Sequence, residues 1–266
     1  QQHDLAMSEI ERAMMQFGID DGILSAALNV RAATGPHEVR RNGSAQPTLS
    51  LCMIVKNEAA HLARCLMSVK PVVNEMVVVD TGSTDRTRDV AAAFGAKVFE
   101  AAWTNDFSAA RNFSLSKATG DWILVLDADE AISAADHARL RRMLNQKPPR
   151  RVAYKMTTRN YSDQVGSRGW TPNDGVYASE EAGRGWVPSL KVRLFANDPR
   201  IRFVNPVHEL VEPTLAQAGM TMEACDIPVH HYGRLDPDQV RAKGEEYYRL
   251  GMKKIQEAAG DPEALK

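Results

Sequence analysis

Between residues 49 and 131, short apolar runs alternate with segments of helical periodicity, and this alternation narrows the possible folds more than any other feature. The apolar runs are LSLCMIVKNE, EMVVVD, AKVFE and DWILVLDADE. Strands that are apolar along their whole length are typical of a parallel sheet whose two faces are covered by helices. The pattern therefore predicts an α/β fold with a mostly parallel sheet.

The rest of the chain adds helical ends and a second group of strands. Apolar positions recur at helical spacing near the start, and a polar stretch with Gly and Pro follows. Beyond residue 131, the segments RVAYKMTTRNY, LKVRLFAN and RIRFVNPVHELVE have the composition of strands. We expect a helical segment at 1–33, a linker at 34–48, a main domain at 49–233 with halves at 49–131 and 132–233, and a helical segment at 234–266.

The composition of the chain excludes several classes of protein. Its 33 basic and 34 acidic residues leave a formal net charge of -1, so no global field attracts nucleic acid. Three cysteines without metal-ligand spacing suit a reducing compartment, and we expect a cytoplasmic protein. There is no run of roughly 18 apolar residues, so we expect no transmembrane segment. Because the chain lacks a first Met and stops at GDPEALK, we expect a fragment of a longer protein.

Three acidic side chains follow two of the predicted strands. Asp80 ends EMVVVD, and Asp127 and Asp129 end DWILVLDADE. The carboxyl ends of parallel strands face one crevice, and alternation along a strand would put Asp127 and Asp129 on the same side. Paired carboxylates suit Mg2+ or Mn2+, whose coordination is usually completed by water and substrate phosphates. The alternative is that these acids only end a strand and cap the next helix.

The stretch VVVDTGSTDRT has the order strand, acid, glycine turn and helix. Turn chemistry alone explains Gly82, Ser83 and Thr84. A carboxylate at the strand end, here Asp80, is available to accept a hydrogen bond from a base or a ribose. The chain has no G-x-G-x-x-G after the first strand and no G-K-[ST], which argues against a dinucleotide-binding fold and a P-loop.

Four motifs, LSLCMIVKNEAAHLARCLMSV, EMVVVDTGSTDRT, WTNDFSAARN and GDWILVLDADE, resemble the donor-binding half of family 2 glycosyltransferases. The resemblance implies the GT-A fold, a Rossmann-like sheet with helices on both faces, here with helical extensions at both ends. LKVRLFANDPRIRFVNPVHE and IPVHHYG resemble the acceptor half of one branch more sparsely. That branch contains peptide and flagellin glycosyltransferases, often fused to tetratricopeptide repeats, and lipopolysaccharide-core glucosyltransferases.

The resemblance also assigns roles in the donor site. It implies that Asp80 contacts the nucleotide base and that Glu58 in KNE and Arg111 in ARN make further nucleotide contacts. Asp127 corresponds to the acid near the ribose and the metal, and Asp129 to the principal ligand of Mn2+ or Mg2+. The donor implied by the resemblance is a nucleotide-diphosphate sugar, with uridine as the nucleoside.

The second half of the chain carries the predicted catalytic residues. Inverting transfer needs a base that takes the proton of the acceptor. By its order along the chain, Glu209 in VHE matches the acidic position of the family, and His208 beside it would orient it or touch phosphate. In VHHYG, His231 matches a position from which the metal or the diphosphate is contacted, and His230 is the alternative. A surface glutamate and core histidines are the rival interpretations.

The sequence leaves the acceptor open. The resemblance implies a protein or peptide such as flagellin, or a lipid-linked saccharide. Trp170 and Trp186 lie in a glycine-rich stretch where they serve either binding or the core. A rival enzyme class is the haloacid-dehalogenase-type phosphatase, but its motif follows the first strand and has Thr where Ala131 stands. A non-enzymatic rival is a docking module that binds nucleotide sugars.

Overall fold

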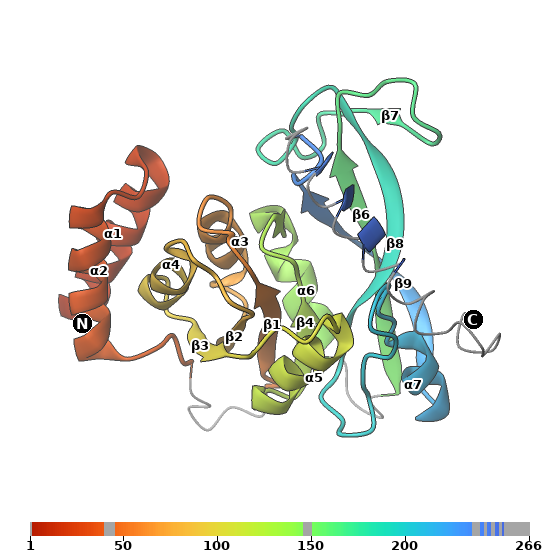
Figure 1. Cartoon of the computed structure of the whole chain (residues 1–266), viewed down its shortest axis with the longest axis horizontal. Coiled ribbons are helices and arrows are strands. Elements are labelled where there is room, and N and C mark those ends of the chain that lie inside the picture. The colour runs from red at the N-terminus through yellow and green to blue at the C-terminus, as the bar shows by residue number, and fades with distance from the viewer. Residues whose placement is uncertain are drawn as a thin grey trace.

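The computed structural model describes residues 2–39, 46–145 and 151–235, and single positions between 240 and 252. Its centre is one mixed sheet with the strand order β3-β2-β1-β4-β8-β6-β9-β5, and β7 pairs with β8 (Figure 1). In this order the strands are Lys97–Glu100, Glu75–Asp80, Leu49–Val55, Trp122–Val125, Gly185–Ala196, Val152–Tyr161, Thr221–His231 and Glu130–Ala131, with β7 at Thr171–Pro172.

The sheet has a parallel half and a mixed half. β1 pairs in parallel with β2 and with β4, and β2 pairs in parallel with β3. β8 runs antiparallel to both β4 and β6 and thereby joins the two halves, while β6 and β9 are parallel. The prediction of an α/β fold around a parallel sheet is confirmed.

Helices cover both faces of the sheet. Buried apolar residues of α1, α2, α3, α4 and α6 belong to one hydrophobic core, and Leu115 of α5 and Leu215 of α7 belong to a second core on the other face (Figure 1). The helices are α1 Gln2–Phe17, α2 Asp21–Thr34, α3 Leu62–Val69, α4 Thr87–Ala93, α5 Phe107–Lys117, α6 His137–Leu144 and α7 Glu212–Gln217, with a 3-10 turn at Ala134–Asp136.

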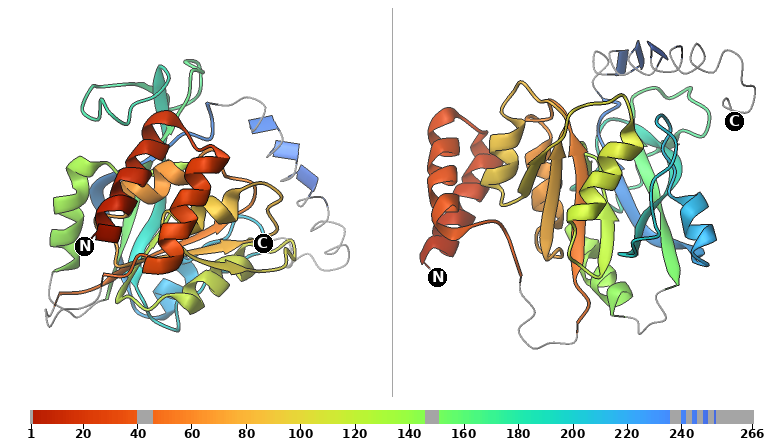
Figure 2. Two further views of the ribbon diagram at one scale, coloured as in Figure 1. Left: turned by 90° about the vertical axis from the view of Figure 1, so that its left-hand side faces the viewer. Right: turned by 60° about the horizontal axis from the view of Figure 1, so that its bottom comes forward.

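The helices α1 and α2 form a hairpin, and α2 packs against α4. The hairpin lies near the edge of the sheet formed by β3 (Figure 2). A buried carboxylate holds it there, because Glu11 pairs with Arg31 of α2 at 2.8 Å and with Lys70 beyond the end of α3. After α2 the chain is tied to the sheet, where His37 N–H donates to Gly95 and Val39 N–H to Asn74.

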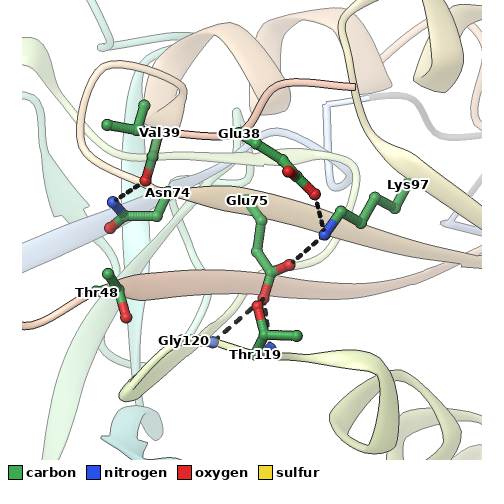
Figure 3. A pocket seen from close by; sticks show the side chains of 8 residues that line it. All are labelled: Glu38, Val39, Thr48, Asn74, Glu75, Lys97, Thr119 and Gly120. Atoms are coloured by element: carbon green, nitrogen blue, oxygen red, sulfur yellow. Dashed lines mark hydrogen bonds and ion pairs between the residues drawn. The ribbon is translucent and has the colours of Figure 1, made fainter. Parts of the chain in front are cut away.

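A polar network closes the amino ends of the strands (Figure 3). The buried carboxylate of Glu75 accepts hydrogen bonds from Lys97 at 2.8 Å and from the Thr119 hydroxyl at 2.9 Å. Lys97 also pairs with Glu38 at 2.6 Å, and these residues line a cavity of about 390 Å³. This cavity lies at the opposite end of the sheet from the predicted site.

Two sequence-based element predictions were wrong. The segment 200–212 is not a strand: among the described residues, its pairing is a single bridge between Val204 and Leu210. The first strand was expected through Glu58 and ends at Val55. Most of the predicted helical segment 234–266, and residues 40–45 of the predicted linker, lie outside the described residues. Within the part of the chain that the structure describes, no helix has the length and apolarity needed to cross a membrane.

Candidate active site

The acidic run after β4 forms a turn. The Glu130 N–H donates to the Asp127 carbonyl at 3.0 Å, and the Asp127 N–H donates to Glu130 Oε2 at 2.9 Å. The prediction that Asp127 and Asp129 lie on one side of an extended strand is therefore wrong. β4 ends at Val125, because the side chain of Glu130 folds back and binds the backbone of the turn.

Each of the three carboxylates in this turn faces a basic side chain from a different element, α5, β9 or β8. The pairs are Asp127 with Arg111 at 2.8 Å, Asp129 with His231 at 3.3 Å, and Glu130 with Arg193. Burial alone would raise the pKa of Asp127, but Arg111, Arg193 and Lys191 outweigh it and hold that pKa well below its usual range. Asp127 is thus kept as a carboxylate.

Arg111 joins the two halves of the chain. Its Nη2 donates to Asp127 at 2.8 Å, and its Nε donates to Glu209 at 2.8 Å. The side chain is almost fully buried, and its Nη1 has no hydrogen-bond partner among the described residues. The acid expected at the donor and the acid expected to act as the base therefore bind one guanidinium group.

The segment with Glu209 is a loop, and its backbone explains why no strand forms. Asn205 and His208 have positive φ angles of 75° and 57°, which non-glycine residues rarely adopt. Between them, Pro206 has no N–H to give to a strand ladder. The Val204–Leu210 bridge closes the loop, and Glu209 points from it to Arg111.

α5 anchors this loop, which explains the residues of the motif DFSAARN. Asp106 caps the helix by accepting from the Ala109 N–H at 2.9 Å. Backbone and side-chain groups of the helix then bind the loop directly. The bonds are Phe107 N–H to the Pro206 carbonyl at 2.9 Å, Ser108 hydroxyl to the Asn205 carbonyl at 2.6 Å, and Asn112 to both the carbonyl and the N–H of Phe203 at 2.9 and 2.8 Å.

Asp80 ends β2 with its carboxylate turned inward. Its Oδ1 accepts from the backbone N–H groups of Gly82 at 3.0 Å and Ser83 at 2.9 Å. Its Oδ2 is buried and has no hydrogen-bond partner among the described residues. A buried acceptor without a donor is costly, and an N–H of a ligand would satisfy it.

Glu58 lies in the loop that follows β1. Its carboxylate contacts Nδ1 of His61 at 3.1 Å, and its backbone N–H donates to the Thr87 hydroxyl at 2.8 Å. The neighbouring Asn57 N–H donates to the Ser83 hydroxyl at 2.9 Å. The loop that carries Glu58 and the turn that follows Asp80 are therefore linked.

Asp129 and His231 have the donor set of a metal site. His231 presents Nε2 to Asp129, and its Nδ1 is buried without a partner among the described residues. Gly233 packs against both, and a Cβ there would clash with Asp129 Oδ2. A carboxylate and an imidazole fit Mn2+, with the remaining positions left to phosphate and water. No set of three or more acidic, His or Cys side chains suited to a metal occurs in the described ranges.

The two adjacent histidines of β9 have different surroundings. His230 is fully buried, its Nδ1 lies 2.8 Å from the Tyr161 hydroxyl, and its ring stacks on that tyrosine. Burial, with the charge of Arg159 added, lowers the pKa of His230 to about 4. His230 is thus a neutral core residue, and His231 is the one that contacts Asp129.

Trp170 lies in the long segment between β6 and β8, and Trp186 lies at the start of β8. The indole N–H of Trp170 donates to the Ser162 carbonyl at 3.0 Å. Arg159 lies over the rings of Trp186 and Tyr177 at 4.6 and 4.9 Å. Beside this long segment, a cavity of about 280 Å³ adjoins the Asp129 turn, and its walls include Arg64, Ala131, Glu180 and Tyr232.

Sequence reasoning missed Arg193, Glu130 and Gly233. A signal existed for Arg193, since it is a charged residue inside the apolar run VRLFA of a predicted strand. Glu130 was visible as the third acid of the run but was given no role of its own. Gly233 carries no local signal, because its importance comes from contacts across the turn.

The chain is similar in sequence to a known protein family and to several known proteins. A model of glycosyl transferase family 2 matches residues 50–197. A TPR repeat-containing protein of Synechococcus elongatus is 42% identical over 198 residues, which make up 72% of this chain and 43% of that protein. The SPbeta prophage-derived glycosyltransferase SunS of Bacillus subtilis is 38% identical over 96 residues, 35% of this chain and 23% of that protein. The chain spans less than half the length of these relatives.

Among solved structures, S. aureus TarS 1-349 in complex with UDP-GlcNAc matches with a TM-score of 0.50 at 15% identity, over 80% of this chain and 67% of that chain. The same protein in complex with UDP matches with a TM-score of 0.50 at 16% identity, over 77% and 63%. At this identity the likeness shows a common fold, and the expected GT-A fold is confirmed. The family prediction is confirmed against the phosphatase class, and the chain belongs to glycosyl transferase family 2.

Proposed function

We propose that the protein transfers a sugar from a UDP-sugar to an acceptor nucleophile, in a metal-dependent reaction that inverts the anomeric centre. One observation carries this proposal: Arg111 binds both Asp127 of the acidic turn and Glu209 of the opposite half. A proposed donor acid and a candidate base thereby contact one guanidinium group. Structural neighbours that hold UDP and UDP-GlcNAc support the choice of donor.

Asp80 and Glu58 are proposed to bind the nucleoside. The unpartnered Oδ2 of Asp80 is suited to accept from a ring N–H of uracil. Glu58 lies on the linked loop beside it, where a carboxylate is suited to accept from ribose hydroxyls. We assign the ribose side of the acidic turn to Asp127.

Asp129 and His231 are proposed to hold Mn2+ or Mg2+. When bound, the ion would neutralise the charge that develops on the leaving nucleoside diphosphate. The chain's own part is to keep both ligands close, 3.3 Å apart, and to leave room for them at Gly233.

Glu209 is proposed as the general base. Its contact with Arg111 at 2.8 Å orients the carboxylate, which would take the proton of an acceptor hydroxyl. His208, next to it on the strained loop, is proposed to orient Glu209 or to contact phosphate. The acceptor we favour is a protein or peptide such as flagellin in the cytoplasm. A lipid-linked saccharide is the second candidate.

Calorimetry of UDP binding tests the donor site directly. UDP is titrated into the chain with Mn2+ and with EDTA, for the native protein and for Asp129→Ala. We expect binding that requires Mn2+ in the native protein and is lost in Asp129→Ala, with circular dichroism showing that the variant is folded. Equal UDP affinity in EDTA, or in Asp129→Ala, would remove the metal from the proposal.

A further inference from the structure

Arg193 and Glu130 form an ion pair beneath the acidic turn that the proposed reaction does not use. Arg193 is 3% exposed and Glu130 2%. Arg193 comes from β8, in the second half of the chain, and its neighbours Val192 and Leu194 belong to the hydrophobic cores. Neither charged group is placed to reach a ligand in solvent.

The pair connects both ends of the turn. Arg193 donates through Nη2 to Glu130 Oε1 and through Nη1 to the Val125 carbonyl at 3.4 Å. Glu130 Oε2 accepts the Asp127 N–H at 2.9 Å, while the Glu130 N–H donates to the Asp127 carbonyl at 3.0 Å. The last residue of β4 and the closing residue of the turn are thus bound to one guanidinium group.

Stability alone does not explain this arrangement. Removing two charges from water costs free energy, and their mutual attraction often does not compensate for this cost. Well-packed apolar residues in place of such a pair frequently give equal or greater stability. The Nε of Arg193 is buried without a partner in the described part of the chain, which adds to the cost. A buried ion pair at this position is better explained by a requirement for one geometry of the turn.

The charge of Arg193 also acts on the neighbouring acid. Its Nη1 lies 3.7 Å from Asp127 Oδ2, so it faces two of the three carboxylates. Without Arg193, three carboxylates would share the turn with less compensating charge.

We propose that Arg193 and Glu130 are positioning residues for the donor site: they fix the turn so that Asp127 and Asp129 present their carboxylates to a metal-bound nucleotide. This inference rests on the proposed function. Partners behind metal ligands typically change metal affinity by about 10- to 100-fold when removed. Neither residue touches the nucleotide or the metal in this scheme.

The test compares UDP affinity at several Mn2+ concentrations in the native chain, Arg193→Met, Arg193→Lys and a control. The matched control is Lys97→Met, which breaks the pair with buried Glu75 at the other end of the same sheet. We expect Arg193→Met to stay folded by circular dichroism and to need at least about tenfold more Mn2+ for half-maximal UDP binding. Arg193→Lys should fall between it and the native chain, and Lys97→Met should bind as the native chain does.

The outcomes separate the inference from the proposed function. Failure of the native chain to bind UDP with Mn2+ would refute both. Native binding together with an unchanged Mn2+ requirement in folded Arg193→Met would overturn the inference alone, as would an equal loss in Lys97→Met. If Arg193→Met does not fold, Glu130→Gln replaces it as the test variant, because it removes one hydrogen-bond acceptor of the turn. An unchanged Mn2+ requirement in Glu130→Gln would refute the proposal.

Discussion

At the scale of the residue, the acidic turn shows how the chain carries three carboxylates at one strand end. Two of them have fully charged partners, since Arg111 and Arg193 face Asp127 and Glu130. The partner of Asp129 is His231, which is uncharged when its proton is lost. Asp129 of this turn and His231 are the two groups that we propose as ligands of a cation.

Gly233 tests this view of the metal site. Its backbone φ is not in the left-handed region, so Gly233→Ala is compatible with the fold, but the new Cβ would clash with Asp129 Oδ2. We expect Gly233→Ala to lower Mn2+-dependent UDP affinity by about tenfold or more. Calorimetry checks this, with Gly166→Ala as the control, since nothing lies within 4 Å of a Cβ there. Equal affinities in both variants would show that Asp129 is not a ligand.

His230 makes stability depend on pH. Its pKa is about 4 in the folded chain and lies at the ordinary 6.5 in the unfolded chain, so the unfolded chain binds more protons between these values. The stabilisation is complete above pH 6.5 and is lost as the pH falls toward 4, on the order of 3 kcal/mol in total. Urea unfolding of native protein and His230→Gln from pH 7 to pH 4 measures it. Parallel curves would contradict the assignment.

At the scale of the element, α5 connects the donor side to the loop with Glu209. One face of the helix carries Arg111, and the same helix fixes the loop through Asn112, which binds Phe203 twice. Since the loop contains two residues with strained backbones, these bonds hold it in a conformation that its own sequence does not favour. The motif DFSAARN is therefore explained mainly by the loop that it holds.

Asn112→Ala separates loop positioning from nucleotide binding. Loss of both bonds to Phe203 should loosen the loop and misplace Glu209, so we expect turnover of UDP-sugar to fall by about tenfold or more. The affinity for UDP should stay unchanged, because Asn112 has no role in the nucleotide site. Ser116→Ala is the control, since that hydroxyl binds only the Phe113 carbonyl of its own helix. Parallel loss of turnover and UDP affinity would refute this division.

Elements with regular patterns were predictable from sequence, and those fixed by distant contacts were not. The strand EMVVVD and its terminal Asp80 lie where the sequence put them. The helix that follows this strand begins at Thr87, and the turn before it is tied to the loop after β1, because the Ser83 hydroxyl accepts from the Asn57 N–H. The pairing of Glu130 with Arg193 depends on β8 lying antiparallel beside β4, which no local pattern encodes.

At the scale of the whole molecule, each half of the sheet supplies residues of the proposed site. The parallel half supplies Asp80 and the acidic turn, and the mixed half supplies Glu209 and His231. Arg111 spans the boundary between them. The resemblance to family motifs predicted that these residues share one site. It did not predict their contacts with one another, such as those of Arg111 with Asp127 and Glu209. Their roles in turnover stay predictions until they are measured.

The most direct test of this account is to compare UDP affinity and UDP-sugar turnover in native protein and in Glu209→Gln. Turnover is followed as release of UDP on transfer of the sugar to water, so that no other acceptor need be known. If Glu209 is the base in the same cleft as the donor, Glu209→Gln binds UDP and Mn2+ as the native chain does while turnover falls by about 100-fold or more. An unchanged rate of UDP release in folded Glu209→Gln would contradict the account.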